Sequence, residues 1–174
     1  GGEGEGNIHR EGGVNSWGYD AKLRATLGAA AEQDVFFQLA CGGGCPLTIQ
    51  NAHESLWGQT VVDLGCGGGH DALLAAHLVG PGGQVYGVDL TTEMLEIATR
   101  NAANTCAGGR TGTCSFLQSA IDDGAALEGV IPADSAHVVI SNGVFNLTAD
   151  KAAAFASAFR VCKPGGKFLL FDVM

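Results

Sequence analysis

The chain has 174 residues, of which 46% are hydrophobic and 16% are charged, and its formal net charge at pH 7 is −9. This length and composition predict one globular domain that needs neither disulfides nor metals to build a core. The acidic balance argues against a nucleic-acid partner or an anionic membrane surface, and no apolar run approaches the roughly 20 residues that span a bilayer.

The first part of the chain is polar and rich in glycine. We expect residues 1–20 to form a flexible segment and residues 21–174 to form the folded domain. Apolar residues at helical spacing predict one helix over 21–40. The start carries no basic region followed by an apolar core, and the cysteines have no disulfide-framework spacing. We therefore expect reduced thiols and a cytoplasmic protein.

From residue 60 onward, short apolar strands alternate with helices. We expect the strands at 60–64, 84–88, 113–117, 136–141 and 167–172. We expect the helices at 70–79, 92–105 and 149–161, with a short helical or irregular piece ending near 129 and a turn at 163–166. This alternation predicts an α/β fold with a Rossmann-like, doubly wound, mostly parallel sheet and right-handed crossovers.

The most informative functional signal follows the first of these strands. The segment VVDLGCGGGHD, at residues 61–71, is a strand that ends in an acid, then a glycine turn, then a helix start. Glycines let backbone N–H groups and a helix N-terminus approach a ligand closely. Asp89 ends the next strand, about 20 residues beyond the loop, which suits a ribose-binding carboxylate. The pattern predicts a site for a cofactor that contains adenosine.

The spacing of the glycines distinguishes between two such cofactors. A dinucleotide loop of the form G-x-G-x-x-G needs glycine at position 70, where this chain has His70. The loop has Gly65, Gly67 and Gly69 instead, which favours the amino-acid part of S-adenosylmethionine over a pyrophosphate. A nicotinamide-dependent oxidoreductase and a purely structural turn are the alternatives.

Four segments of the chain carry a family resemblance: VVDLGCGGGHD, VYGVDLTTEMLEIA, HVVISNGVFNL and FRVCKPGGKFLLFDV. Together they resemble the successive motifs of class I S-adenosylmethionine-dependent methyltransferases, and more narrowly those of the arsenite methyltransferase family. The similarity covers residues 39–174. It implies the class I methyltransferase fold, S-adenosylmethionine as the cofactor and a small-molecule methyl acceptor.

The resemblance also implies roles for individual residues. Asp63 and the loop backbone, Cys66 included, would hold the methionine part of the cofactor, and Asp89 would accept hydrogen bonds from both ribose hydroxyls. Ser141 and Asn142 end the fourth strand, and Asn142 would lie beside the transferable methyl group as the candidate catalytic residue. The residues implied to contact the adenine are Leu90, Met94, Ala120 and Ile121.

Three of these assignments have alternatives. Met94 could be an ordinary helix residue that faces the sheet, and Asn142 could fix its own loop. The family often has an acid near Ala120 to bond the adenine amino group, and here Asp122 or backbone atoms would take that role.

The cysteines bear on the identity of the acceptor. In the arsenite family a cysteine typically follows the Ser-Asn pair, and this chain has Gly143 there. Cys41 and Cys45 could supply thiolates to a soft metalloid, or they could be incidental thiols. The sequence predicts that Cys106, Cys114 and Cys162 are small buried apolar residues. No Cys or His pair has zinc-site spacing, so we expect no metal site.

The family usually adds an antiparallel strand hairpin after the strand equivalent to 167–172, whereas this chain ends at Met174 and lacks it. Because an open parallel edge invites pairing, we expect a homodimer or a fragment of a longer protein. The leading hypothesis is a methyltransferase that acts on a small molecule. The alternative is an S-adenosylmethionine-binding module without its own catalytic activity.

Overall fold

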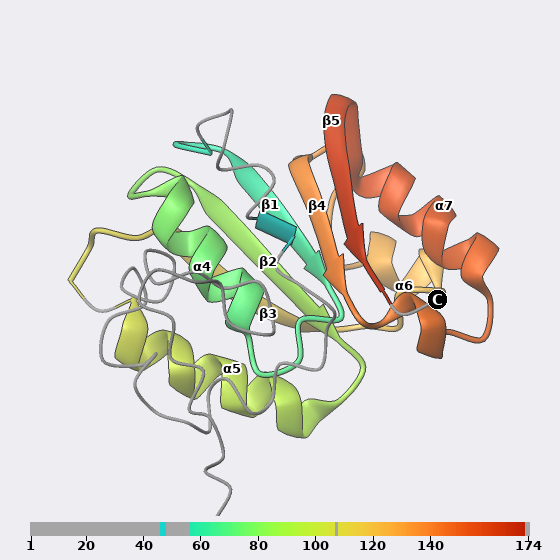
Figure 1. Cartoon of the computed structure of the whole chain (residues 1–174), viewed down its shortest axis with the longest axis horizontal. Coiled ribbons are helices and arrows are strands. Elements are labelled where there is room, and N and C mark those ends of the chain that lie inside the picture. Colours follow the sequence, from blue (N-terminus) through green and yellow to red (C-terminus); the bar gives the residue numbers. More distant parts are fainter. Residues whose placement is uncertain (1–45, 48–55, 107, 173–174) are drawn as a thin grey trace, which may run out of the picture.

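The computed structural model describes residues 46–47, 56–106 and 108–172. The expected flexible segment 1–20, the expected helix 21–40, and Cys41 and Cys45 lie outside these described residues. The described part of the chain forms a five-stranded, fully parallel sheet in the order β3-β2-β1-β4-β5 (Figure 1). The strands are β1 (Thr60–Leu64), β2 (Gln84–Asp89), β3 (Thr113–Gln118), β4 (Ala136–Asn142) and β5 (Cys162–Phe171).

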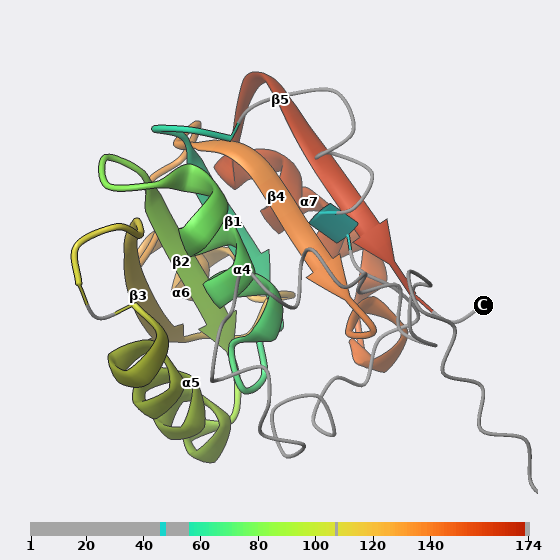
Figure 2. The same ribbon diagram turned by 60° about the vertical axis from the view of Figure 1, so that its left-hand side comes forward.

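Helices cover both faces of this sheet. One face carries α4 (His70–Val79) and α5 (Thr92–Thr105), and the other carries α6 (Gly124–Glu128) and α7 (Lys151–Val161) (Figure 2). A short 3-10 turn, η2 (Phe145–Leu147), follows β4. This arrangement confirms the Rossmann-like, doubly wound sheet that the sequence predicts.

The central strand β1 divides its side chains between two hydrophobic cores. Val61 packs into the core under α4, whereas Val62 and Leu64 pack into the core under α6 and α7. All three are fully buried, as expected for a parallel strand covered on both faces. The two-residue period of the strand directs Asp63 to the same face as Val61, toward α4.

The order of the strands reverses at β1. The chain passes from β1 to β2 and β3 on one side, and then returns to place β4 on the other side of β1. Ligands of open α/β sheets bind in the crevice that such a reversal leaves at the carboxyl ends of the strands. The topology therefore puts the ends of β1, β2 and β4 around one site.

The start of α7 differs from the expected boundary. The helix begins at Lys151 rather than at residue 149 because Asp150 caps it. The Asp150 carboxylate accepts a hydrogen bond of 2.9 Å from the backbone N–H of Ala153, which satisfies one of the unpaired donors at the helix start.

The expected turn at 163–166 is wrong as a separate element, because β5 already begins at Cys162. Along this pair of strands, β4 advances from Ala136 to Val138 while β5 advances from Cys162 to Lys167. The extra residues form an irregularity inside the strand, and Gly165 adopts a positive φ of 78° there. The glycines thus mark a bend, but the bend belongs to β5.

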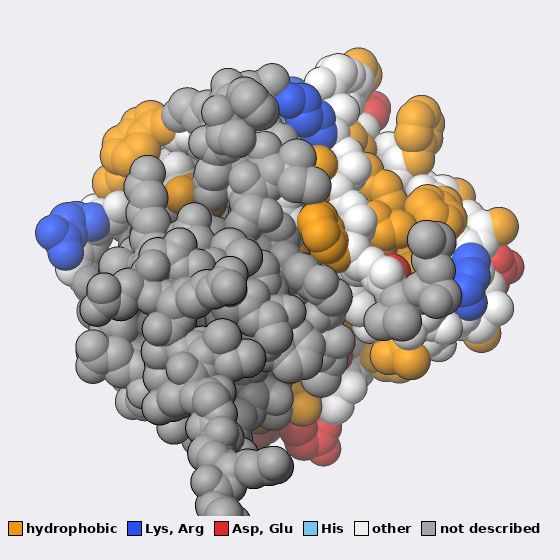
Figure 3. Space-filling model, viewed as in Figure 1, with side chains coloured by type: hydrophobic (Ala, Val, Ile, Leu, Met, Phe, Trp, Pro, Cys, Tyr) orange, Lys and Arg blue, Asp and Glu red, His pale blue; other side chains and the backbone are white. Residues whose placement is uncertain are grey.

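The part of the molecule formed by β5 and α7 carries apolar side chains that are partly or largely exposed. Figure 3 shows such side chains on the side of the molecule where β5 and α7 lie, and Phe159 of α7 is 84% exposed. Among the described residues, β5 pairs with β4 alone. The homodimer expected from the sequence stays a prediction. None of the described helices has the length and apolar character needed to cross a membrane.

Candidate functional site

A cavity of about 600 Å³ lies at the carboxyl ends of β1, β2 and β4. This volume is in the range typical of small-molecule sites. The cavity brings together most of the residues that the sequence singles out. Its wall includes Asp63, Gly65, Cys66, Gly67, Asp89, Leu90, Met94, Ala120, Ile121 and Asn142.

Two of the expected cofactor-binding residues, Gly69 and Ser141, do not line this cavity. Gly69 precedes α4 with a φ of 88°, and a Cβ there would lie 3.1 Å from the Cβ of Ala98, so its open side faces α5. Ser141 is fully buried, and its hydroxyl donates a 2.7 Å hydrogen bond to the carbonyl of Leu64. Gly69 therefore packs against α5, and Ser141 joins the ends of β4 and β1, outside the cavity lining.

The glycine loop is held in place by β2. The backbone N–H groups of Gly65 and Cys66 both donate to the carbonyl of Val88, at 2.7 and 2.8 Å. Gly65 has a φ of 79°, and a Cβ at this position would lie 2.3 Å from the side chain of Val144. Gly67 has a φ of 51°, but a Cβ there would meet nothing within 4 Å. The loop therefore needs glycine at position 65 for both conformation and space.

Asp89 joins the loop to the helix that follows β2. Its Oδ2 accepts a 2.9 Å hydrogen bond from the backbone N–H of Gly67, and its Oδ1 accepts one of 2.9 Å from that of Thr91. An ionised carboxylate has about four acceptor positions. Asp89 can therefore accept further hydrogen bonds from a ligand in the cavity while it fixes the loop.

Asp63 is a buried carboxylate at the end of β1. Only 2% of the residue is exposed, and its Oδ2 has no hydrogen-bond partner in the described part of the chain. Burial raises the pKa of Asp63 well above its ordinary value, and the nearby charges of Asp71 and Asp89 raise it further. A positively charged group beside Oδ2 would lower the pKa again, because it favours the ionised carboxylate.

Asn142 is oriented by a residue that the sequence reasoning missed. Its side-chain Nδ2 donates a 3.0 Å hydrogen bond to Oδ2 of Asp71, in the first turn of α4. Asp71 is itself buried and lines the cavity. An acid in the first turn of the helix after the glycine loop was the available signal, since a helix N-terminus favours negative charge.

The cavity is acidic. Asp63, Asp71, Asp89 and Asp122 line it, and none of the described lining residues is Lys or Arg. His70 also lines it, and burial lowers the pKa of this imidazole to about 4, so it is neutral at pH 7. This charge pattern suits a cationic ligand and opposes the pyrophosphate of a dinucleotide.

Soft or metal ligands are sparse in the described site. Gly143 lines the cavity with a φ of 71°, at the position where the arsenite family typically has cysteine. The described ranges contain no cluster of three or more His, Cys, Asp or Glu side chains arranged for a metal ion. Cys66 contributes a thiol to the wall, but burial raises its pKa and so disfavours the thiolate.

Comparison with known proteins gives a consistent picture. A family model described as a methyltransferase domain matches residues 57–174. The arsenite methyltransferase of Halobacterium salinarum is 36% identical over 160 residues, which cover 90% of this chain and 36% of that protein. The arsenite methyltransferase of Aquipseudomonas alcaligenes is 38% identical over 130 residues, which cover 75% of this chain and 36% of that protein.

A solved structure resembles this fold as well. It is the arsenic(III) S-adenosylmethionine methyltransferase of Chlamydomonas reinhardtii, with a TM-score of 0.72 and 34% sequence identity. The match covers 86% of this chain and 48% of that one. The chain spans about a third of the length of the curated relatives it matches.

The loop geometry predicts different costs for two glycine substitutions. Gly65→Ala should lower the free energy of unfolding by about 3 kcal/mol, because it adds both positive-φ strain and a clash with Val144. Gly67→Ala adds the strain alone and should cost about 1–2 kcal/mol. Urea unfolding of both variants measures the difference; equal costs would contradict the close approach of Val144.

The buried carboxylate predicts a pH effect on stability. Because the folded-state pKa of Asp63 is raised, its stabilising contribution is fully present below about pH 3.9, the unfolded value, and is lost as pH rises through the folded pKa. The free energy of unfolding is measured in urea at several pH values for Asp63→Asn and for the original protein. As pH rises, the value for Asp63→Asn should increase relative to that of the original protein, because asparagine does not ionise.

Stability also depends on His70, with the opposite sign. Its lowered pKa makes stability increase between about pH 4 and 6.5. Both proteins contain His70, so the difference between them isolates Asp63. A difference that does not change with pH would show that Asp63 ionises as freely in the folded protein as in the unfolded chain.

Proposed function

This chain belongs to the methyltransferase domain family, and we propose that it transfers the methyl group of S-adenosylmethionine to a small-molecule acceptor. The cofactor would occupy the acidic cavity, with its amino-acid part on the glycine loop and its adenosine toward the end of β2. When bound, it supplies a methyl group on a positively charged sulfur that a nucleophile can attack.

The buried Asp63 carries most of this proposal. S-adenosylmethionine has a sulfonium, an ammonium and a carboxylate, so it is a net cation at neutral pH. The unpartnered Oδ2 of Asp63 is a natural acceptor for the ammonium group, and an ion pair there would offset the raised pKa of the carboxyl. A dinucleotide would bring two negative charges into the same acidic wall.

The adenosine side of the cavity suits the remainder of the cofactor. Asp89 keeps acceptor positions that ribose hydroxyls could fill, besides the two backbone N–H groups that it already binds. Four lining residues offer an apolar surface and a thioether for a flat ring, which is a favourable contact for adenine. They are Leu90, Met94, Ala120 and Ile121.

Methyl transfer depends mainly on alignment and on the exclusion of water. In the proposed complex, the side chain of Asn142 lies beside the methyl group that is transferred. Its hydrogen bond to Asp71 fixes the orientation of the carboxamide. Asp71 is then a positioning residue that acts through Asn142. A soft acceptor with a free lone pair needs no general base, which agrees with the low pKa, about 4, that makes His70 in the cavity wall a weak base.

Arsenite is the acceptor to test first, because the two curated relatives above are arsenite methyltransferases. Gly143 removes the thiol expected after Ser141-Asn142, so any thiolates for a metalloid would come from elsewhere in the protein, such as Cys41 and Cys45. The cytoplasmic location and the homodimer expected from the sequence stay predictions.

The proposal predicts a large loss of affinity when Asp89 is changed. In calorimetry with S-adenosylhomocysteine, Asp89→Ala should raise Kd by about tenfold to a hundredfold, because it removes ribose acceptors and releases the loop. Glu96→Ala is the matched control: it removes the same charge from an exposed position on α5 and should leave Kd unchanged. The same proteins are then assayed for transfer of labelled methyl groups to arsenite in the presence of a small thiol. Their activities should follow the order of their affinities, with Asp89→Ala the least active.

Each arm has a distinct negative result. If the original chain binds neither S-adenosylhomocysteine nor S-adenosylmethionine, the cofactor assignment is wrong. If it binds them but methylates neither arsenite nor any of a panel of thiols and small acceptors, the catalytic part of the proposal is wrong. If NAD binds instead, the oxidoreductase alternative replaces both.

A further inference from the structure

One part of the cavity wall takes no part in the cofactor contacts assigned above. It runs from the end of β4 through η2 to the start of α7, and we call residues 143–149 the η2 segment. Five of its residues line the cavity: Gly143, Val144, Leu147, Thr148 and Ala149. Because the segment directly follows Asn142, which is assigned to a place beside the methyl group, it lies on the side where a methyl acceptor would bind.

The η2 segment presents an apolar surface to the cavity. Val144 packs near the glycine loop, where a Cβ on Gly65 would clash with its side chain. The hydroxyl of Thr148 is already bonded within the segment, because it donates to the carbonyl of Phe145 at 2.9 Å. Leu147 lines the cavity and yet is 78% exposed, so most of this side chain is open to a ligand. Burial of such a leucine against another apolar surface is favourable.

Sulfur does not contribute to this part of the wall. Residues 143–149 include no cysteine, and Cys66 lines the cavity from the glycine loop. Cys106, Cys114 and Cys162 do not line the cavity. The expectation that these three are buried is wrong, because each is only partly buried against the hydrophobic cores. The η2 segment therefore offers an acceptor apolar contact rather than a thiol ligand.

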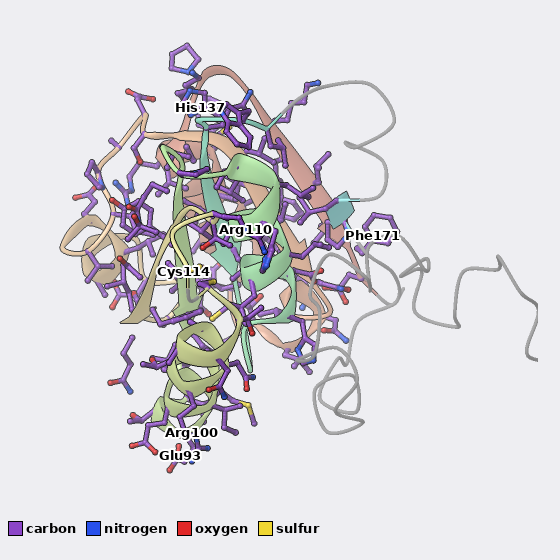
Figure 4. The ribbon with its side chains drawn as sticks, turned by 90° about the vertical axis from the view of Figure 1, so that its left-hand side faces the viewer. Glu93, Arg100, Arg110, Cys114, His137 and Phe171 are labelled. Atoms are coloured by element: carbon purple, nitrogen blue, oxygen red, sulfur yellow. The ribbon has the colours of Figure 1, made fainter. Side chains whose placement is uncertain are left out.

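The end of β5 holds the start of the η2 segment. The backbone N–H of Gly143 donates to the carbonyl of Phe171 at 2.8 Å, and Figure 4 labels Phe171 at the end of that strand. Val144, at the N-cap position of η2, provides no side-chain cap. Oδ2 of Asp172 instead accepts a 3.0 Å hydrogen bond from the backbone N–H of Asn146. Asp172 thus caps the turn from another element, although it does not line the cavity.

Two further contacts fix the rest of the segment. Nζ of Lys151, in the first turn of α7, donates to the carbonyls of Asn146 and Thr148 at 3.4 and 3.3 Å. Phe145 is 3% exposed, and its ring lies 5.5 Å from that of Phe168 on β5. The conformation of the η2 segment is therefore set in large part by β5 and α7.

We propose that the η2 segment is the acceptor-facing wall of the site, in which Leu147 contacts the acceptor and Asp172 is a positioning residue that acts through Leu147. The proposal rests on the proposed methyl transfer. It assigns the acceptor to the class of uncharged small molecules with an apolar surface. The acidic wall opposes an anion, and the positive sulfur of the bound cofactor opposes a second cation.

Steady-state kinetics test the two roles. Methyl transfer to arsenite is measured in the presence of 2-mercaptoethanol, an uncharged small thiol. Leu147→Ala and Asp172→Ala should each lower kcat/KM for arsenite about tenfold. Calorimetry should find the Kd of S-adenosylhomocysteine within about twofold of the original value in both variants, because neither side chain belongs to the assigned cofactor contacts.

Two more variants distinguish positioning from a merely structural role. If Asp172 acts through Leu147, the double variant should lose about as much activity as the more damaged single variant, rather than the product of both losses. Asp172→Asn should recover most of the activity, because its carboxamide oxygen can still accept the N–H of Asn146.

The chain offers a matched control for each substitution. Asp123→Ala removes the same kind of bond, a 3.0 Å cap on the backbone N–H of Ala126, from α6. Phe159→Ala removes an apolar side chain that is 84% exposed on α7. Asp123 and Phe159 do not line the cavity, so both variants should keep the original kcat/KM. Thermal unfolding checks that every variant is folded.

Hydrogen exchange tests the role of Asp172 without any turnover. In the ligand-free full chain, peptides that cover residues 143–149 should exchange faster in Asp172→Ala than in the original protein, because the cap on Asn146 is lost. The same peptides should exchange at the original rate in Asp123→Ala. Equal exchange in Asp172→Ala and the original protein would overturn the positioning role.

The outcomes separate this inference from the proposed function. If the original chain methylates arsenite but Leu147→Ala keeps the original kcat/KM, the acceptor-facing wall is wrong while the proposed function stands. Losses that multiply in the double variant, or an Asp172→Asn variant as impaired as Asp172→Ala, overturn the positioning role alone. If the original chain methylates neither arsenite nor the panel of small acceptors, the proposed function fails and the acceptor-facing wall fails with it.

Discussion

The site depends on a carboxylate that is buried before any ligand is present. Asp63 lies on the face of β1 covered by α4, it is 2% exposed, and two further acids lie close enough to raise its pKa. An uncompensated charge in such a position costs the folded protein free energy. A cationic ligand would remove that cost, so under the proposed function the buried carboxylate that destabilises the ligand-free protein would also favour the cationic cofactor.

The rest of the fold serves to hold this arrangement. β1 lies between β2 and β4, where the strand order reverses. The carboxyl ends of both neighbouring strands therefore lie beside the glycine loop, and they carry Val88, Asp89 and Asn142. Asp89 ties the loop to the turn before α5, and Ser141 ties the end of β4 to β1. Because side chains at the ends of β2 and β4 hydrogen-bond to backbone groups of the loop, of the turn before α5 and of the end of β1, the loop geometry follows from the sheet.

Much of this could be predicted from the sequence, because the signals are local. Apolar runs and glycine turns gave the bounds of β1, α4 and α5 as the structure has them. The start of β5 could not be predicted in the same way: Lys163-Pro164-Gly165-Gly166 has the composition of a turn, but pairing with β4 extends the strand across it. Tertiary hydrogen bonding here overrides local preference.

The differences between the expected and the observed lining of the cavity have the same origin. Gly69 and Ser141 belong to the right motifs, but their open side and hydroxyl point to α5 and β1, which only the packed structure reveals. Asp71 was missed because its importance comes from Asn142, 71 positions away in the sequence.

The most direct test of this account is the number of protons released when S-adenosylhomocysteine binds. It is measured by calorimetry in buffers of different ionisation enthalpy, from about pH 5 to 8. If the ammonium group of the ligand forces Asp63 to ionise, binding should release protons at pH values below the raised pKa of Asp63, and the release should disappear in Asp63→Asn. Binding without proton release at every pH, or proton uptake, would contradict the central role of the buried carboxylate.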